Sequence, residues 1–259
     1  MDSKINIQNI NNINSGQNAN ISKGNRKSPL LAGVLSFAIP GAGSFYNKQY
    51  LKTAVYLGVE AAAITVGLIY DKKGDDQTAF FENYANQHWD VKRYARWTLA
   101  NADKINPNID PSQYGVFDNN GNVNWNELNR LEGDIGSWYS HRLARFGEQQ
   151  YFEMIGKYSQ FNVGWDEFGD DETKPYVFGD PLTNEFIYYS KQRGKANDFY
   201  DVAKWAVIGI VVNHFVSALE SAWSAHQINK NLKTSVTIEK IKIGYFVEHY
   251  PRLNISFRF

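Results

Sequence analysis

The sequence predicts a mainly α-helical integral membrane protein with about three hydrophobic helices, a helical extramembrane domain and a short C-terminal β-hairpin. Three apolar stretches, residues 28–47, 53–70 and 205–225, carry at most one Asp, Glu, Lys or Arg each. Each stretch is close to the roughly 20 residues that an α-helix needs to cross a bilayer. The C-terminal residues then change to an alternation of apolar and polar side chains, which is the period of a β-strand.

Residues 1–27 predict a disordered polar tail. They are rich in Asn and contain no apolar run, so we expect no intact signal peptide here. The chain has no Cys, which excludes disulfides, thiolate metal sites and Cys nucleophiles. Between residues 75 and 200, 20 Asp and Glu outnumber 12 Lys and Arg, and this acidic balance argues against nucleic acid as a partner.

Residues 28–70 predict a membrane helical hairpin with a turn at the sequence PGAG, in which the first helix is short, kinked or re-entrant and the second is a full span. A Pro disfavours helix at the residue before it, and the two Gly permit a sharp bend. Aromatic rings and two Lys follow, as is typical of a membrane–water boundary, where Lys48 and Lys52 are expected to reach outward. A helix–turn–helix inside a soluble core is the alternative. The residues of this motif are Pro40, Gly41, Gly43, Tyr46, Asn47, Tyr50 and Lys52.

Residues 71–201 predict an acidic, aromatic-rich helical domain outside the membrane. We expect one helix over about residues 77–102 and two more in NWNELNRLEGDIGSWYSHRLA and GEQQYFEMIGKYSQFNVGW, followed by a loop in KPYVFGDPLTNEF. The next helix leads into the third membrane helix, residues 202–228.

Residues 229–259 predict a β-hairpin with strands at 241–247 and 253–259 and a Pro-containing turn at 248–252. A terminal Phe after alternating apolar residues is also typical of the last strand of an outer-membrane barrel, although one hairpin cannot close a barrel. A small sheet packed against the extramembrane domain is the other interpretation. The sequence therefore leaves inner and outer membrane undecided.

A polar stripe crosses two of the apolar segments. Asn213, Ser217, Glu220 and Ser224 share one face of a helix, with His214 beside them, and Glu60 lies in the second segment. Polar groups inside a membrane are costly, so they face other helices or water. The stripe is either a proton or ion site or a set of interhelical hydrogen bonds, and in both cases we expect Glu60 to face Asn213, His214 or Ser217.

Other candidate sites are weaker, and the sequence predicts no metal, cofactor or catalytic residue. VFDNNGNVNWNE resembles a calcium-binding loop with Asp118, Asn120 and Glu127 at ligand positions, but Val116 stands at the first position. Asn-Asn-Gly is also a strong turn signal, so we expect a turn. The five His show no metal-ligand spacing.

The segment SPLLAGVLSFAIPGAGSFYNKQYLK resembles the P-x-x-A-x-x-x-S-x-x-x-P-G-x-G-x-x-Y-N-x-x-Y-x-K signature of a family of bacterial envelope membrane proteins, domain of unknown function 5683. The matching residues are Pro29, Ala32, Ser36, Pro40, Gly41, Gly43, Tyr46, Asn47, Tyr50 and Lys52. NHFVSALESAWSAH is similar to the family's N-x-x-x-S-A-x-D-A segment, with Glu220 at the acidic position. The resemblance implies a location and an architecture but no activity.

Together these observations predict a non-enzymatic protein of the bacterial cell envelope that acts as a scaffold or interaction protein. Its expected partners are the lipid bilayer and another envelope protein. The alternative is a transporter or channel component that uses Glu60 and the stripe from Asn213 to Glu220.

Overall fold

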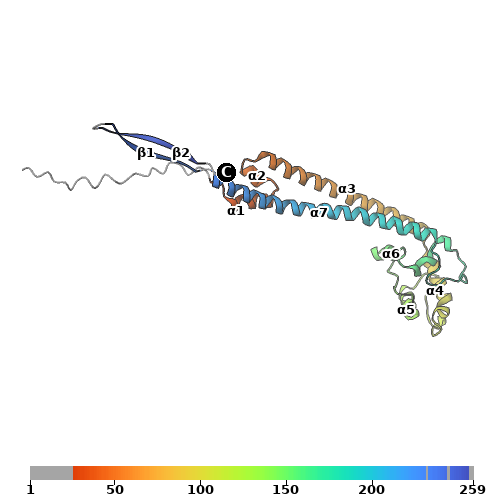
Figure 1. The fold of residues 1–259 in the computed structure, drawn as a ribbon. Coiled ribbons are helices and arrows are strands. Elements are labelled where there is room, and N and C mark those ends of the chain that lie inside the picture. The colour runs from red at the N-terminus through yellow and green to blue at the C-terminus, as the bar shows by residue number, and fades with distance from the viewer. Residues whose placement is uncertain (1–25, 232, 244–245, 257–259) are drawn as a thin grey trace, which may run out of the picture. The chain divides into compact units, whose positions relative to one another are not determined.

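The computed structural model describes residues 26–231, 233–243 and 246–256, and the chain is mainly helical (Figure 1). The chain divides into two compact units, one of Met1–Ala63 and Ile208–Phe259 and one of Ile64–Val207. The predicted tail falls almost entirely outside the described residues. The elements in order are α1 (Pro29–Ala38), α2 (Ala42–Tyr46), α3 (Tyr50–His88), α4 (Val91–Ile105), η2 (Pro111–Gln113), α5 (Trp125–Ile135), α6 (Gln149–Met154), η3 (Ser159–Gly164), η4 (Asp166–Phe168), α7 (Asn184–Asn231), β1 (Lys233–Ile243) and β2 (Phe246–Ser256).

The first unit contains the predicted PGAG turn between two helices. Ser28 caps α1 by accepting a hydrogen bond from Leu31 N, and Pro at the first helical position supports the same start. The helix ends at Ile39, which is extended, as expected for a residue before Pro. Gly41 then has φ 87°, a left-handed conformation that favours Gly, and α2 begins directly after it.

Two helices, α3 and α7, are long and apolar enough to cross a membrane by length and composition. The apolar window of α3 is 0% buried and that of α7 is 17% buried, so neither resembles the core helix of a soluble protein. The first apolar stretch forms only the 10-residue α1, about 15 Å long, which is too short to span a bilayer. Within the residues that the structure describes, two of the three expected hydrophobic helices thus have the length of a span.

The second unit has a core made largely of aromatic side chains. Trp165, Tyr94, Tyr189 and Phe161 are each fully buried. They come from the residue between η3 and η4, from α4, from α7 and from η3, respectively. Phe81 and Ala85 of α3 belong to the same core, which therefore joins the short helices to both long ones. Aromatic residues bury large apolar areas, which explains how these short elements are held together.

The single helix predicted over residues 77–102 is wrong. Helix α3 continues without a break through residues 71–76 to His88, and α4 starts anew at Val91. The break occurs because Asp90 is extended and its carboxylate accepts a hydrogen bond from Lys92 N, which caps α4. The expected boundaries at residues 70–71 and 201–202 likewise fall inside α3 and α7.

The other two predicted helices of this unit are shorter than expected. Helix α5 ends at Ile135 because Gly136 has φ 57°, a conformation that terminates helices. Only α6, Gln149–Met154, is α-helical in the second segment, and the rest is turn or 3-10 helix. The expected loop is present and α7 begins at Asn184, where Thr183 Oγ1 accepts a hydrogen bond from Phe186 N.

Strands β1 and β2 pair antiparallel, in a register that runs from Lys233 with Ser256 to Ile243 with Phe246. The predicted turn at residues 248–252 is wrong, because these residues lie inside β2 and Pro251 pairs with Ile238. A two-stranded sheet has only edge strands, and an edge strand tolerates Pro. The sequence interpretation overlooked the Thr, Val and Ile of residues 233–240 as strand formers.

Candidate functional site: the polar seam

Helix α7 carries a line of buried polar side chains that faces α1, α2 and the start of α3; we call these contacts the polar seam. Asn213, Ser217, Ser221 and Ser224 are spaced three or four residues apart, so they share one helical face. Ser217 and Ser221 are 0% exposed, and Asn213 and Ser224 are 6% exposed. Such groups need hydrogen-bond partners when they are removed from water.

The PGAG turn supplies several of these partners. Gly41 N donates to Ser217 Oγ at 2.8 Å, and Gly43 N donates to Ser36 Oγ at 2.8 Å. The Ser36 and Ser221 hydroxyls lie 2.7 Å apart and form a hydrogen bond. The turn is therefore attached to α7 directly through Gly41 N and indirectly through Gly43 N, by way of Ser36.

The two Gly of the turn are required for different reasons. Gly41 has a positive φ, and a Cβ there would lie 2.9 Å from Thr53 O. At Gly43 the constraint is close packing alone, since a Cβ would lie 1.9 Å from Ala32 O. Because this oxygen belongs to the backbone of α1, a side chain at position 43 would push α1 and α2 apart.

Glu60 faces α7, as the sequence predicted. Its carboxylate accepts a hydrogen bond from Asn213 Nδ2 at 2.9 Å, and His214 Nε2 lies 3.2 Å from it. His214 Nδ1 lies 2.6 Å from Phe37 O in α1, so the ring connects three helices. Ser217 is the exception among the expected partners, because it bonds to the turn instead.

A second ionic contact closes the other end of the polar seam. Lys52 forms a salt bridge with Glu220, whose carboxylate also accepts hydrogen bonds from Ser224 Oγ at 2.6 Å and Ser44 Oγ at 3.3 Å. The side chain of Lys52 remains 45% exposed, and its pairing with Glu220 is a contact that the sequence did not predict. The opposite charge of Lys52 compensates the partial desolvation of Glu220.

The remaining motif residues are structural. Asn47 Nδ2 donates to Ser221 O at 2.8 Å. The Tyr46 hydroxyl accepts a hydrogen bond from Ser28 N at 3.1 Å, and the Lys27 ammonium lies 4.3 Å from the centre of the Tyr46 ring. Tyr50 is 60% exposed, as an aromatic residue at a boundary would be.

The second unit contains a buried carboxylate. Glu132 is 0% exposed, and burial raises its pKa to about 7, although three hydrogen bonds oppose the shift. These come from Tyr94 Oη at 2.6 Å, Leu143 N at 2.9 Å and Asn129 Nδ2 at 2.9 Å. With both oxygens bonded inside the core, Glu132 acts as a cross-link between α4, α5 and the loop after α5.

The segment resembling a calcium loop is a tight turn, as predicted. Asp118 Oδ1 accepts hydrogen bonds from Asn120 N at 2.9 Å and Asn122 N at 2.8 Å. Gly121 has φ 73°, and Val116 is 1% exposed. Glu127 pairs with Arg130 at 2.6 Å. The carboxylates of Asp118 and Glu127 are thus already used in local contacts.

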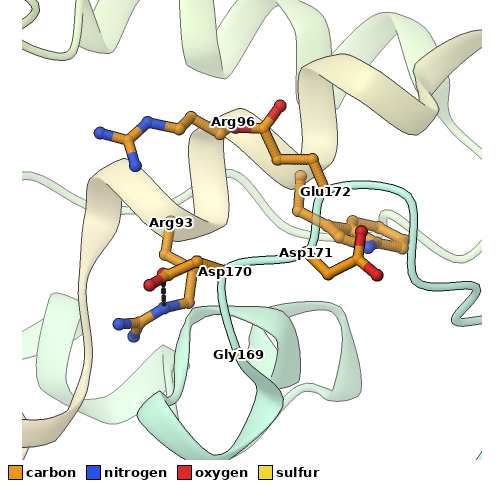
Figure 2. A pocket seen from close by; sticks show the side chains of 7 residues that line it. Arg93, Arg96, Gly169, Asp170, Asp171 and Glu172 are labelled. Carbon is orange, nitrogen blue, oxygen red and sulfur yellow. Dashed lines mark hydrogen bonds and ion pairs between the residues drawn. The ribbon is translucent and has the colours of Figure 1, made fainter.

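A small pocket of mixed charge lies between α4 and the loop that follows η4. Figure 2 shows Arg93 directed at Asp170, with Arg96 pointing away from this pair. Arg93 Nε donates to Asp170 Oδ1 at 2.8 Å, and this hydrogen bond lowers the pKa of Asp170. Because the charges of Arg93 and Asp170 neutralise each other, the pocket does not favour either an anionic or a cationic ligand.

Sequence reasoning missed several residues of the polar seam, notably Ser44, Ser221 and the Lys52–Glu220 pair. Ser221 continues the three-to-four spacing of Asn213, Ser217 and Ser224, so the stripe could have been extended to it from the sequence. Comparisons of the chain with protein-family models, with curated proteins and with solved structures find no match.

Proposed function

We propose that the chain is an integral membrane protein with two spans, formed by α3 and α7. The observation that carries this proposal is the exposure of large apolar side chains along both helices. On α7 the exposed residues include Val207, Val211, Val212, Phe215, Val216 and Leu219, and on α3 they include Leu51, Val55, Leu57, Val59, Ile64 and Leu68. Water would make these surfaces unfavourable, whereas lipid would cover them.

Aromatic residues end both apolar surfaces at the spacing of a bilayer. Trp205 and Trp223 of α7 are 67% and 65% exposed, and 18 helical residues separate them by about 27 Å. Tyr50 and Tyr70 of α3 are about 30 Å apart by the same rise. The hydrocarbon core of a bilayer is roughly 30 Å thick, and Trp and Tyr favour its two interfaces.

Two spans return the chain to the side on which it entered. Residues 71–201, which connect the two spans, then lie on one side of the membrane. Helix α1 exposes Leu30, Val34 and Phe37, so it is placed within the membrane interface instead of crossing the bilayer.

The role that this arrangement supports is that of a non-enzymatic scaffold or interaction protein. In the polar seam, Glu60, Lys52 and Glu220 are all engaged with other side chains, which favours a role in holding helices together. The resemblance of residues 28–52 to a bacterial envelope family supports a location in the cell envelope. The domain of residues 71–201 is then the part that meets an envelope partner.

Purification of the full chain from membranes in mild detergent tests this proposal. We expect a reproducible co-purifying envelope protein, and we expect Glu60→Gln to retain it, since Gln keeps a hydrogen-bonding group opposite Asn213. The contrary result is a chain that purifies alone and, in reconstituted vesicles, conducts ions or protons in a way that Glu60→Gln abolishes. That result would establish the transporter instead.

A further inference from the structure

Three side chains with metal-binding atoms converge in the second unit. His88 is the last residue of α3, Asp166 is the first residue of η4, and Glu185 lies in the first turn of α7. One nitrogen or oxygen atom from each residue lies within 4.8 Å of the atoms from the other two. Three separate elements thus direct one imidazole and two carboxylates to a common point.

The spacing of these atoms matches that of ligands around a zinc ion. His88 Nδ1 lies 3.2 Å from Asp166 Oδ2 and 3.6 Å from Glu185 Oε1. Ligands bound tetrahedrally at about 2.0–2.2 Å lie about 3.4 Å apart. An ion therefore fits between the three groups with only small movements of the side chains.

Each carboxylate is held by its other oxygen. Asp166 Oδ1 forms an ion pair with Arg93 Nη1 at 2.9 Å, and Glu185 Oε2 accepts a hydrogen bond from Glu167 N at 2.8 Å. The oxygens that face His88 are thereby oriented toward the common point. Partners of this kind fix the direction of metal ligands in known sites.

The backbone around the cluster is also fixed. Trp89 and Trp165, which directly neighbour His88 and Asp166, form an isolated β-bridge. Trp89 is 6% exposed and Trp165 is 0% exposed. Because the bridge joins the two chain segments inside the aromatic core, it sets the separation of His88 from Asp166 independently of any ion.

The charge and exposure of the cluster favour a divalent transition metal. With a neutral imidazole, the two carboxylates carry a charge of −2, of which Arg93 beside Asp166 offsets one unit, so the point between the three groups stays negative. The side chains of His88, Asp166 and Glu185 are 35%, 43% and 20% exposed, which leaves room for water as a further ligand. An imidazole nitrogen suits Zn²⁺ better than Ca²⁺ or Mg²⁺, which prefer oxygen ligands.

We propose that His88, Asp166 and Glu185 form a binding site for Zn²⁺ or a related divalent transition metal. The site revises the expectation from the sequence, which contained no metal motif. The three ligands are separated by 78 and 19 residues, so no local spacing indicates them. Only the folding of the second unit brings them together.

Isothermal titration of ZnCl₂ into the full chain in detergent, after removal of bound metal with a chelator, tests the site. We expect one saturable site, and we expect His88→Ala and Glu185→Gln each to weaken it at least tenfold. His141→Ala is the matched control, because His141 is a partly exposed His of the same unit that stacks on Tyr158, and it should leave the affinity unchanged. Millimolar Ca²⁺ or Mg²⁺ should not displace the zinc.

Cobalt gives a second measurement that does not depend on affinity. Co²⁺ bound by His88 and two carboxylates should show visible absorption bands that Asp166→Asn alters, with thermal melting used to confirm that the variant folds. Absence of a saturable site, unchanged zinc binding in His88→Ala and Glu185→Gln, or equal competition by Mg²⁺ would each overturn the proposal. Equal competition by Mg²⁺ would indicate that the cluster attracts cations through its negative charge alone, without selecting a transition metal.

Discussion

Glu132→Gln should remove a pH dependence of stability from this protein. Burial raises the pKa of Glu132 to about 7 in the folded chain, whereas a Glu in an unfolded chain titrates near 4.5. Between pH 4.5 and pH 7 the folded chain therefore keeps a proton on Glu132 that the unfolded chain has released. The stability from this group is thus fully present below about pH 4.5 and is lost as the pH rises through about 7, where Glu132 must carry a buried charge.

The size of the effect follows from the difference in pKa. About 2.5 units correspond to about 3 kcal/mol of unfolding free energy at most. For a unit of this size, that is a change in melting temperature of roughly 6–12 °C. Gln keeps the shape and an acceptor for Leu143 N and Asn129 Nδ2, but it cannot accept from Tyr94 as well, at a cost of about 1 kcal/mol.

Thermal melts of the full chain in detergent between pH 5 and pH 8, followed by Trp fluorescence, measure this difference. The wild-type protein should lose stability relative to Glu132→Gln as the pH rises from 5 to about 7, and the difference should level off above pH 7. The exposed Glu148→Gln is the matched control and should follow the wild-type profile. Parallel profiles for wild type and Glu132→Gln would refute the assignment of a raised pKa.

Three further predictions follow from the packing. The double variant Gly33→Cys, Ala222→Cys should form a disulfide in this Cys-free chain, because a Cβ at Gly33 would lie 3.4 Å from the Ala222 Cβ. Absence of the cross-link on non-reducing gels would contradict the contact of α1 with α7. Gly43→Ala should lower the melting temperature far more than the control Gly58→Ala, because a Cβ at position 58 meets nothing within 4 Å. Equal decreases in melting temperature would argue against close packing at the turn. Millimolar Ca²⁺ should leave the melting temperature unchanged because Asp118 is occupied in its own turn, and a saturable increase would disprove this.

Local signals in the sequence predicted the parts of the fold that depend on local rules. The bend at Pro40 and Gly41 follows from backbone sterics, and the contact of Glu60 with Asn213 follows from the cost of an isolated carboxylate among apolar residues. Helix ends were less predictable. The break before α4 depends on Asp90 as a cap and on the bridge of its neighbour Trp89 to Trp165, 76 residues away.

The contacts that the sequence could not predict are those between distant residues. Lys52 is 168 residues from Glu220, and no pattern in either segment pairs them. The burial of Glu132 depends on the loop after α5, which closes over it through Leu143 N. In the C-terminal sheet, the Pro of β2 suggested a turn because Pro usually interrupts strands, but pairing along the whole of β1 outweighed this local preference.

The central claim is that α3 and α7 each span a bilayer and that residues 71–201 connect the two spans. Single Cys residues introduced at Leu57, Asp76 and His226, treated in sealed vesicles with a membrane-impermeant maleimide, test it directly. Leu57→Cys should stay unlabelled until the membrane is dissolved, because a thiol in hydrocarbon does not ionise. Asp76→Cys and His226→Cys should be labelled from opposite sides of the membrane. Labelling of both from the same side, or labelling of Leu57→Cys in intact vesicles, would contradict the account.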